Sequence, residues 1–230
     1  MTVTDVNVVK SAIFERPDDA NKGTLGSLLC VCGSYGMAGA AVMSAKGALR
    51  TGIGLAKCAL PRSIYPIVAQ TILESVYYPL SENADGRISK VNVPFLVSES
   101  CKSSATLVGC GLGVCDDTLK IVFSLIENST TPLVLDADAL NCVAKQPEIL
   151  LRKKAPIIIT PHPGEMSRLT GLATPLVNAE RERVALDFAQ KYGVVTVLKG
   201  AGTVIASPNG KVLVNPTGNS GMATGGSGDV

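Results

Sequence analysis

Short apolar runs rich in β-branched residues alternate with segments of helical periodicity along most of this 230-residue chain. Apolar runs occupy residues 25–32, 55–60, 75–78, 105–110, 132–135, 156–160 and 194–198, and helical patterns occupy residues 38–51, 116–128, 137–144 and 178–192. Continuous apolar strands are typical of a sheet covered on both faces, and the alternation favours parallel connections. We therefore predict an α/β fold, with a mostly parallel central sheet between two layers of helices.

The C-terminal part of the chain departs from this alternation. Two β-rich runs, 203–206 and 211–214, flank the turn sequence Ser207-Pro208-Asn209-Gly210. Asn-Gly between two such runs is a strong hairpin signal. We therefore expect the last strands to be antiparallel and to lie at the edge of the sheet.

The composition excludes several classes of protein. A hydrophobic fraction of 46% and a charged fraction of 17% argue against disorder, and the length suits one domain spanning residues 1–230. The net charge is only +2, and no basic run is longer than Arg152-Lys153-Lys154. Phe, Tyr and Trp together make up 4% of the residues, which leaves little material for stacking bases. We expect no nucleic-acid partner.

The cysteines and the apolar stretches indicate the compartment. Seven cysteines, an odd number without a C-x-x-C pair, are typical of reduced, buried thiols and not of a disulfide framework. The single histidine, His162, excludes a zinc site built on two histidines. No uninterrupted apolar stretch approaches the roughly 18 residues of a membrane span. We predict a cytoplasmic protein that has no membrane partner.

Glycines gather where the predicted strands end, at residues 33–36, 109–113, 200–202 and 225–228. Ligands of open α/β sheets bind outside the carboxyl ends of the strands, so several of these loops should meet at one site. None of them has the spacing of a P-loop, and a single glycine-rich loop is as readily a tight turn that needs a positive φ.

The most informative loop is Thr224-Gly225-Gly226-Ser227-Gly228-Asp229, because three side-chain-free positions come directly before a carboxylate. Its backbone N–H groups can line an anion hole, and Asp229 can accept a proton from a hydroxyl that attacks phosphorus. Alternatively, Asp229 caps the start of a helix. The two roles are compatible.

Two further segments carry polar residues at strand ends. In Thr160-Pro161-His162-Pro163-Gly164-Glu165, two prolines bracket His162. Glu165 is a candidate for holding Mg²⁺ through water, or it satisfies the N–H groups of a helix start. Asp136 and Asp138 follow the run 132–135, and such a pair suits metal binding or acid–base work. We expect at least one of this pair to be a helix N-cap.

In their order along the chain, these segments resemble the ADP/ATP-dependent NAD(P)H-hydrate dehydratases. The resemblance runs from residue 33 to the C-terminus and rests on these motifs: Gly33-Ser34, Gly39-Ala40-Ala41, Gly109-x-Gly111-Leu112-Gly113, Asp136-Ala137-Asp138-Ala139-Leu140-Asn141, Thr160-Pro161-His162-Pro163-Gly164-Glu165, Leu198-Lys199-Gly200-Ala201-Gly202-Thr203 and the terminal Gly225-Gly226-Ser227-Gly228-Asp229. It implies a ribokinase-like three-layer sandwich. It also implies a lyase that dehydrates NAD(P)H carrying a hydroxyl at C6, by phosphoryl transfer from ADP or ATP with Mg²⁺ and elimination of phosphate.

The resemblance also implies roles for particular residues. Those expected to contact the hydrate are Ala40, Gly111, Gly113, His162 and Asp229, the last of which acts as the base. Those expected to bind the nucleotide are Lys199, Gly200, Ala201, Gly202, Thr203, Gly225, Gly226, Ser227 and Gly228. The small residues Ala40 and Ala41 leave room for a bulky dinucleotide, and the terminal glycines supply the backbone donors that phosphoryl transfer needs.

Two alternatives stay open at this point. In the first, the chain is a small-molecule kinase of the same fold that acts on a vitamin-precursor alcohol. In the second, it is a nucleotide-binding module without activity. His162 favours the dehydratase, because the related kinases typically carry Asn there, within an N-x-x-E segment. Bacterial members of this family usually continue in several helical segments after the Gly-Ser-Gly-Asp run, and the family often forms tetramers. We therefore expect a homo-oligomer, and a domain that lacks the C-terminal helices beyond Val230.

Overall fold

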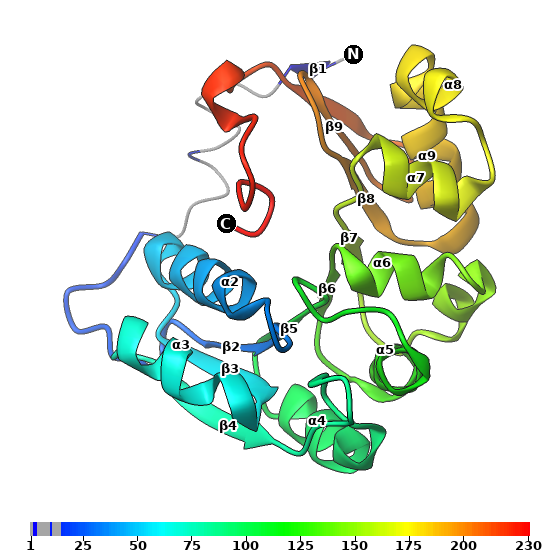
Figure 1. Ribbon diagram of the computed structural model, residues 1–230. Helices are drawn as coiled ribbons and strands as arrows, with labels where there is room; N and C mark the ends of the chain where they lie inside the picture. Colours follow the sequence, from blue (N-terminus) through cyan, green and yellow to red (C-terminus); the bar gives the residue numbers. More distant parts are fainter. Residues whose placement is uncertain (1, 4–9, 11–14) are drawn as a thin grey trace.

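The computed structural model describes residues 2–3, 10 and 15–230. The strands of these residues form one sheet in the order β1-β10-β9-β8-β7-β6-β5-β2-β3-β4 (Figure 1). The bounds are β1 Thr2–Val3, β2 Ser27–Val31, β3 Leu55–Pro61, β4 Val76–Leu80, β5 Ala105–Val108, β6 Leu133–Leu135, β7 Ile157–Ile159, β8 Val195–Leu198, β9 Thr203–Ala206 and β10 Val212–Asn215. From β4 through β8 all neighbours are parallel, which confirms the predicted sheet.

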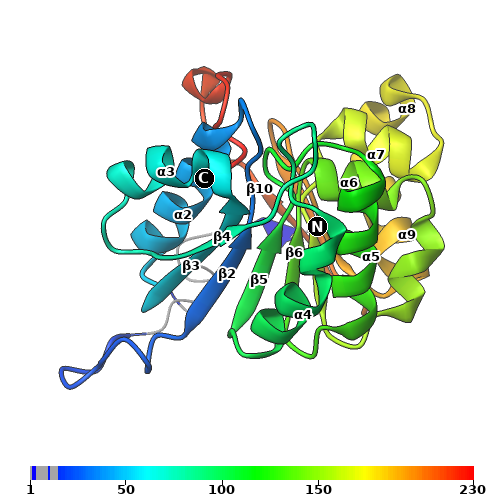
Figure 2. The ribbon, with the colours of Figure 1, turned by 60° about the horizontal axis from the view of Figure 1, so that its bottom comes forward.

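Helices cover both faces of the sheet (Figure 2). The α-helices are α2 Ala38–Thr51, α3 Tyr65–Thr71, α4 Val93–Cys101, α5 Asp116–Asn128, α6 Asp138–Val143, α7 Pro163–Thr170, α8 Thr174–Ala179 and α9 Arg181–Tyr192. The 3-10 helices are η1 Arg62–Ile64, η2 Lys90–Asn92, η3 Pro147–Arg152 and η4 Ser220–Met222. In Figure 2, α2 and α3 lie on one side of the strands, and α4 to α9 lie on the other.

Strand β2 shows why the apolar runs are continuous. Its alternate residues Leu29 and Val31 belong to the larger hydrophobic cluster, which contains the buried side chains of α5, α6, α7 and α9. Cys30, between them, belongs to a second cluster with buried residues of α2 and α3. Since successive side chains point to opposite faces, a strand buried on both sides needs an apolar residue at every position.

The C-terminal hairpin is confirmed, with one addition at its outer edge. Strands β9 and β10 are antiparallel around the turn at Ser207, whose backbone N–H donates to the Lys211 carbonyl oxygen at 2.9 Å. Strand β9 is also antiparallel to β8. The short strand β1 pairs in parallel with β10, so β10 has neighbours on both sides.

The helical pattern at 178–192 differs from the prediction of one helix. The structure divides this region into α8 and α9, and Glu180 between them has non-helical backbone angles of φ −127° and ψ 40°. Helices α3 and α4 lie outside the helical patterns predicted from the sequence. Both are short helices with proline in the first turn, where the missing N–H of proline has no cost.

All seven cysteines are free thiols, and five of them are buried, as their apolar surroundings predict. Among the described residues, no helix combines the length and the apolar character needed to cross a membrane.

Candidate functional site

Loops that follow the parallel strands meet at the carboxyl edge of the sheet, and backbone hydrogen bonds join them. The Gly33 N–H, after β2, donates to the Cys110 carbonyl oxygen, after β5, at 2.8 Å. The Lys199 N–H, after β8, donates to the Pro161 carbonyl oxygen, after β7, also at 2.8 Å. The predicted meeting of the strand-end loops is confirmed at these two contacts.

Helix α2 begins against the loop that follows β5. Gly111 has a positive φ of 62°, and a Cβ placed on it would lie 2.7 Å from the Cβ of Ala40. The Ser34 hydroxyl donates to the Gly111 carbonyl oxygen at 2.8 Å and fixes this approach. Ala40 and Gly111, both expected to contact the hydrate, are therefore in contact because neither carries a longer side chain.

An ion pair joins the loops after β6 and β8. The Lys199 Nζ lies 2.6 Å from Oδ1 of Asp136, whose residue is only 5% exposed. Lys199 itself remains partly exposed. A nearly buried carboxylate needs a partner because desolvation disfavours its charge, and Lys199 supplies that partner.

Asp138 ties two loops together. Its Oδ2 accepts the Gly113 N–H at 2.8 Å, and its Oδ1 accepts the Asn141 side-chain amide at 3.2 Å. The N-cap of α6 is Ala137, at the unusual positive φ of 49°, and no side chain caps the helix. The expectation that Asp136 or Asp138 caps this helix is therefore wrong, because both carboxylates are engaged by groups from other loops.

His162 and Glu165 form a capping box at the start of α7. The His162 N–H donates to Glu165 Oε2 at 2.8 Å, and His162 Nδ1 accepts the Gly164 N–H at 3.0 Å. Burial lowers the pKa of His162, and the charges of Lys199 and Arg168 lower it further. Burial raises the pKa of Glu165, although the hydrogen bond from His162 opposes the shift. The lowered pKa favours the neutral imidazole of His162, and Glu165 satisfies the helix start.

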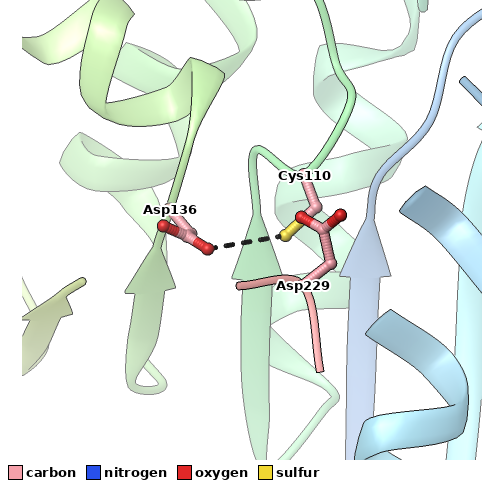
Figure 3. Close-up of side chains that lie close together, drawn as sticks. All are labelled: Cys110, Asp136 and Asp229. Atoms are coloured by element: carbon pink, nitrogen blue, oxygen red, sulfur yellow. Dashed lines mark hydrogen bonds between the residues drawn. The ribbon is translucent and has the colours of Figure 1, made fainter. Parts of the chain in front are cut away.

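The segment that follows η4 carries Asp229 to the strand-end loops. Figure 3 shows its carboxylate beside the Cys110 thiol, with Asp136 on the other side of the sulfur. Burial raises the pKa of Asp229, hydrogen bonding to the Cys110 thiol opposes this, and the negative charge of Asp136 adds to the rise. A carboxylate of raised pKa at the carboxyl edge of the sheet is suited to accept a proton near neutral pH.

The glycine turn before Asp229 is partly closed on itself. The Asp229 N–H donates to the Gly226 carbonyl oxygen at 3.0 Å, and the Ser227 N–H donates to Thr224 at 3.4 Å. Gly228 lies next to Lys199, since a Cβ placed on it would be 3.6 Å from the lysine Nζ. The structure therefore brings Gly228, Asp229 and Lys199 together, while two of the N–H groups expected at an anion hole hold the turn.

The loop after β8 lies beside a cavity of about 600 Å³. Arg181 donates to the carbonyl oxygens of Leu198 and Lys199 at 2.8 and 3.2 Å, and so fixes where the loop leaves the strand. Ala201 and Gly202 line the cavity, together with residues 178–183 and side chains of β9 and β10. The predicted nucleotide loop thus borders an open space.

Two residues of the site escaped the sequence analysis. Cys110 was grouped with the buried cysteines, although its position between two glycines at a strand end could have marked it. Arg181 lies in a helical pattern, and its Nε is buried without a hydrogen-bond partner. No sequence signal distinguishes Arg181 from the other charged residues of that helix.

Comparison with known proteins identifies relatives of the whole described domain. The model of a family described as NAD(P)H-hydrate dehydratase matches residues 28–230. A bifunctional NAD(P)H-hydrate repair enzyme of Thermofilum pendens is 41% identical over 94% of this chain, and the chain spans 41% of that relative's length. An ADP-dependent (S)-NAD(P)H-hydrate dehydratase of Neisseria meningitidis is 34% identical, over 94% of this chain and 69% of its own.

The fold also matches a solved structure. The ADP/ATP-dependent NAD(P)H-hydrate dehydratase of Bacillus subtilis, co-crystallised with ATP and Mg²⁺, superposes with a TM-score of 0.83 at 31% identity. The match covers 99% of this chain and 77% of that protein. The three-layer α/β architecture predicted from the sequence is confirmed.

Proposed function

Because the chain belongs to the NAD(P)H-hydrate dehydratase family, we propose that it converts hydrated NADH or NADPH back to NADH or NADPH, with ADP or ATP as co-substrate. Such an enzyme is a carbon–oxygen lyase that repairs a damaged metabolite. The activities named for the relatives support the reaction. The chain spans about two-fifths of the length of the Thermofilum pendens relative, and the family model that matches it is that of the dehydratase. The proposal is therefore restricted to the dehydratase reaction.

One observation carries the proposal: Asp229 lies at the meeting point of the loops, with a cation and a glycine backbone beside it. The Lys199 ammonium is next to Gly228, directly before Asp229. Positive charge and backbone donors are what a transferring phosphoryl group requires, and a carboxylate is what the attacking hydroxyl requires. Lys199 and the backbone of Gly228 meet the first requirement, and Asp229 meets the second.

The proposed chemistry has two steps. In the first, Asp229 accepts the proton of the C6 hydroxyl while the hydroxyl oxygen forms a bond to the terminal phosphorus of the nucleotide. The bond between that phosphorus and the bridging oxygen breaks, which releases AMP from ADP or ADP from ATP. In the second, the C6–O bond breaks with assistance from the ring nitrogen, phosphate leaves, and loss of a C5 proton restores the double bond. Phosphate is a far better leaving group than hydroxide, which is why a phosphoryl donor is needed.

The nucleotide is proposed to lie along the loop after β8 and the terminal glycine turn. Lys199 and the backbone of Gly200, Ala201, Gly202 and Thr203 would hold its phosphates together with residues 225–228. The cavity of about 600 Å³ beside Ala201 and Gly202 has room for the nucleoside. The ATP bound to the Bacillus subtilis relative supports a nucleotide site in this fold.

Mg²⁺ fits the donors of the site, since carboxylate oxygens and phosphates are its preferred ligands. When bound, it would neutralise charge on the phosphates. Asp229 offers an oxygen directly, whereas Glu165 is already engaged by the His162 N–H. That engagement favours the indirect role proposed for Glu165, through a water molecule.

The hydrate is proposed to lie between the start of α2 and the loops after β5 and β7. Ala40, Gly111 and Gly113 would contact it through small surfaces that leave room for a dinucleotide. Because Nδ1 accepts the Gly164 N–H, the neutral ring of His162 carries its proton on Nε2 and can donate a hydrogen bond from that atom. Asp229 would contact the reacting hydroxyl.

The decisive experiment is incubation of the protein with NADHX, Mg²⁺ and either nucleotide, which should restore the absorbance of NADH. No recovery with either nucleotide would contradict the proposal. Asp229→Asn should lower kcat by at least about 100-fold while nucleotide affinity stays within about twofold. Asp187→Asn, which changes an exposed carboxylate on α9, is the matched control and should leave the rate unchanged.

The same assay separates the two alternative functions. Accumulation of a phosphorylated alcohol would indicate a kinase, and nucleotide binding without any turnover would indicate a binding module.

We further propose that the protein acts in the cytoplasm, which its seven free thiols support. We also propose a homo-oligomer, specifically a tetramer, which light scattering coupled to gel filtration will test.

A further inference from the structure

Cys110 places a thiol between two carboxylates of the candidate site. Its Sγ, Asp136 and Asp229 each offer one ligand atom, and these atoms lie within 4.8 Å of one another (Figure 3). Cys110 is 1% exposed and Asp136 is 5% exposed, whereas Asp229 is partly exposed and borders solvent. The three side chains come from three separate segments of the chain, so the fold itself brings them together.

The separation of the sulfur from one carboxylate oxygen is slightly longer than in a tetrahedral metal site. The Cys110 Sγ lies 3.9 Å from Asp136 Oδ2. Zinc bound to a thiolate at about 2.3 Å and to a carboxylate oxygen at about 2.1 Å would separate sulfur and oxygen by about 3.6 Å. Lys199 contacts the other oxygen of Asp136, Oδ1, whereas Oδ2 accepts a hydrogen bond from the thiol, a weak donor.

The charges also match a divalent cation. With the thiol ionised, the three ligands carry three negative charges, of which Lys199 offsets one. A divalent cation neutralises the remaining two, and buried charge is tolerated when it is compensated in this way. A sulfur ligand favours zinc or cadmium over magnesium, whose preferred ligands are oxygen atoms.

We propose that Cys110, Asp136 and Asp229 bind a thiophilic divalent cation of the Zn²⁺ class, with solvent as the fourth ligand. Binding releases the thiol proton to solvent and joins the sulfur to the metal. It also engages the Asp229 carboxylate, so that Zn²⁺ inhibits any reaction in which Asp229 is the base. The inhibition rests on the proposed dehydratase function, whereas the binding does not.

Binding is tested with Cd²⁺, whose bond to a thiolate gives an ultraviolet charge-transfer band. The background is the Cys101→Ser/Cys115→Ser protein, which lacks the two partly exposed cysteines. We expect one Cd²⁺ per chain, and loss of the band in Cys110→Ala. The matched control Cys58→Ala removes another buried thiol, which contacts Ser75 instead of a carboxylate, and should keep the band. A band absent from the background protein, or unchanged in Cys110→Ala, would overturn the site.

Asp229→Asn provides a test that keeps the thiol in place. Loss of one ligand should weaken Cd²⁺ affinity at least about tenfold, since even the loss of an outer partner costs that much. Unchanged affinity would show that Asp229 is not a ligand. If the dehydratase assay succeeds, Zn²⁺ should inhibit it reversibly, with relief by a chelator and a higher half-inhibitory concentration in Cys110→Ala. If that assay fails, the Cd²⁺ band still decides the site.

Discussion

Lys199 and Asp136 form an ion pair of 2.6 Å between two loops that are 63 residues apart in the chain. The pair is asymmetric, because the carboxylate is nearly buried while the ammonium is partly exposed. Removing one partner of such a pair leaves the other to bear its own desolvation. The two residues should therefore respond differently to substitution.

Lys199→Met should lower the free energy of unfolding by about 2–3 kcal/mol, because it leaves the buried Asp136 carboxylate without its cation. Asp136→Asn should cost only about 1 kcal/mol, since the freed lysine can be hydrated. Urea denaturation of both single variants and the double variant measures each cost and their coupling. Equal costs for the two single variants would contradict the asymmetry.

Gly111→Ala should destabilise the protein by about 1–3 kcal/mol and weaken binding of the hydrate, because its φ is positive and its Cβ would press on Ala40. Gly39→Ala, at the exposed start of the helix α2 that contains Ala40, is the matched control, because a Cβ there meets nothing within 4 Å. Thermal unfolding and hydrate KM are the measurements. Addition of Ala40→Gly should recover part of the loss by removing the steric contact, and no recovery would leave the backbone angle as the whole cause.

Glu165 can be tested for its two roles separately. Glu165→Gln preserves an oxygen for the His162 N–H and should leave stability within about 0.5 kcal/mol, whereas Glu165→Ala loses the capping box at a cost of about 1 kcal/mol. If Glu165 also holds Mg²⁺ through water, the Gln variant should need more Mg²⁺ for half-maximal rate. An unchanged Mg²⁺ requirement in a stable Gln variant would assign Glu165 to the helix start alone.

The acid side of the pH profile should report Asp229. Burial and the charge of Asp136 raise the pKa of Asp229, so the rate should fall as the pH drops through that raised value. Asp136→Asn removes the negative charge that raises the pKa of Asp229 and retains the positive charge of Lys199 that lowers it. The pKa of Asp229 should therefore fall in this variant. The acid limb of kcat/KM should therefore move to lower pH, and a limb that moves upward would contradict the assignment of Asp229 as the base.

The sheet could be predicted because its central strands are buried on both faces. Leu29, Cys30 and Val31 must all be apolar when alternate residues enter different cores, and this gives a continuous run that stands out in the sequence. The break between α8 and α9 could not be predicted in the same way. It depends on the backbone of Glu180, a residue type that is compatible with a helix.

The site could be predicted as a set of loops but not as a set of contacts. Glycines at strand ends and Asp229 were visible because the residue types themselves are unusual there. The partner of Asp136 was not, since a lysine 63 residues away becomes its neighbour only when the strands are ordered. An acid at a strand–helix junction is compatible both with a helix cap and with a contact to another loop, and only the fold distinguishes the two.

Helix α2 helps to position Asp229. The segment that carries Asp229 touches α2 at two points, where a Cβ on Gly47 would lie 3.0 Å from the Val230 carbonyl carbon and a Cβ on Gly226 would clash with Met43. Neither Gly47 nor Met43 has a proposed role in the chemistry. These contacts nevertheless position the segment that carries Asp229, so a methyl group added at Gly47 is expected to displace the Asp229 carboxylate from the strand-end loops.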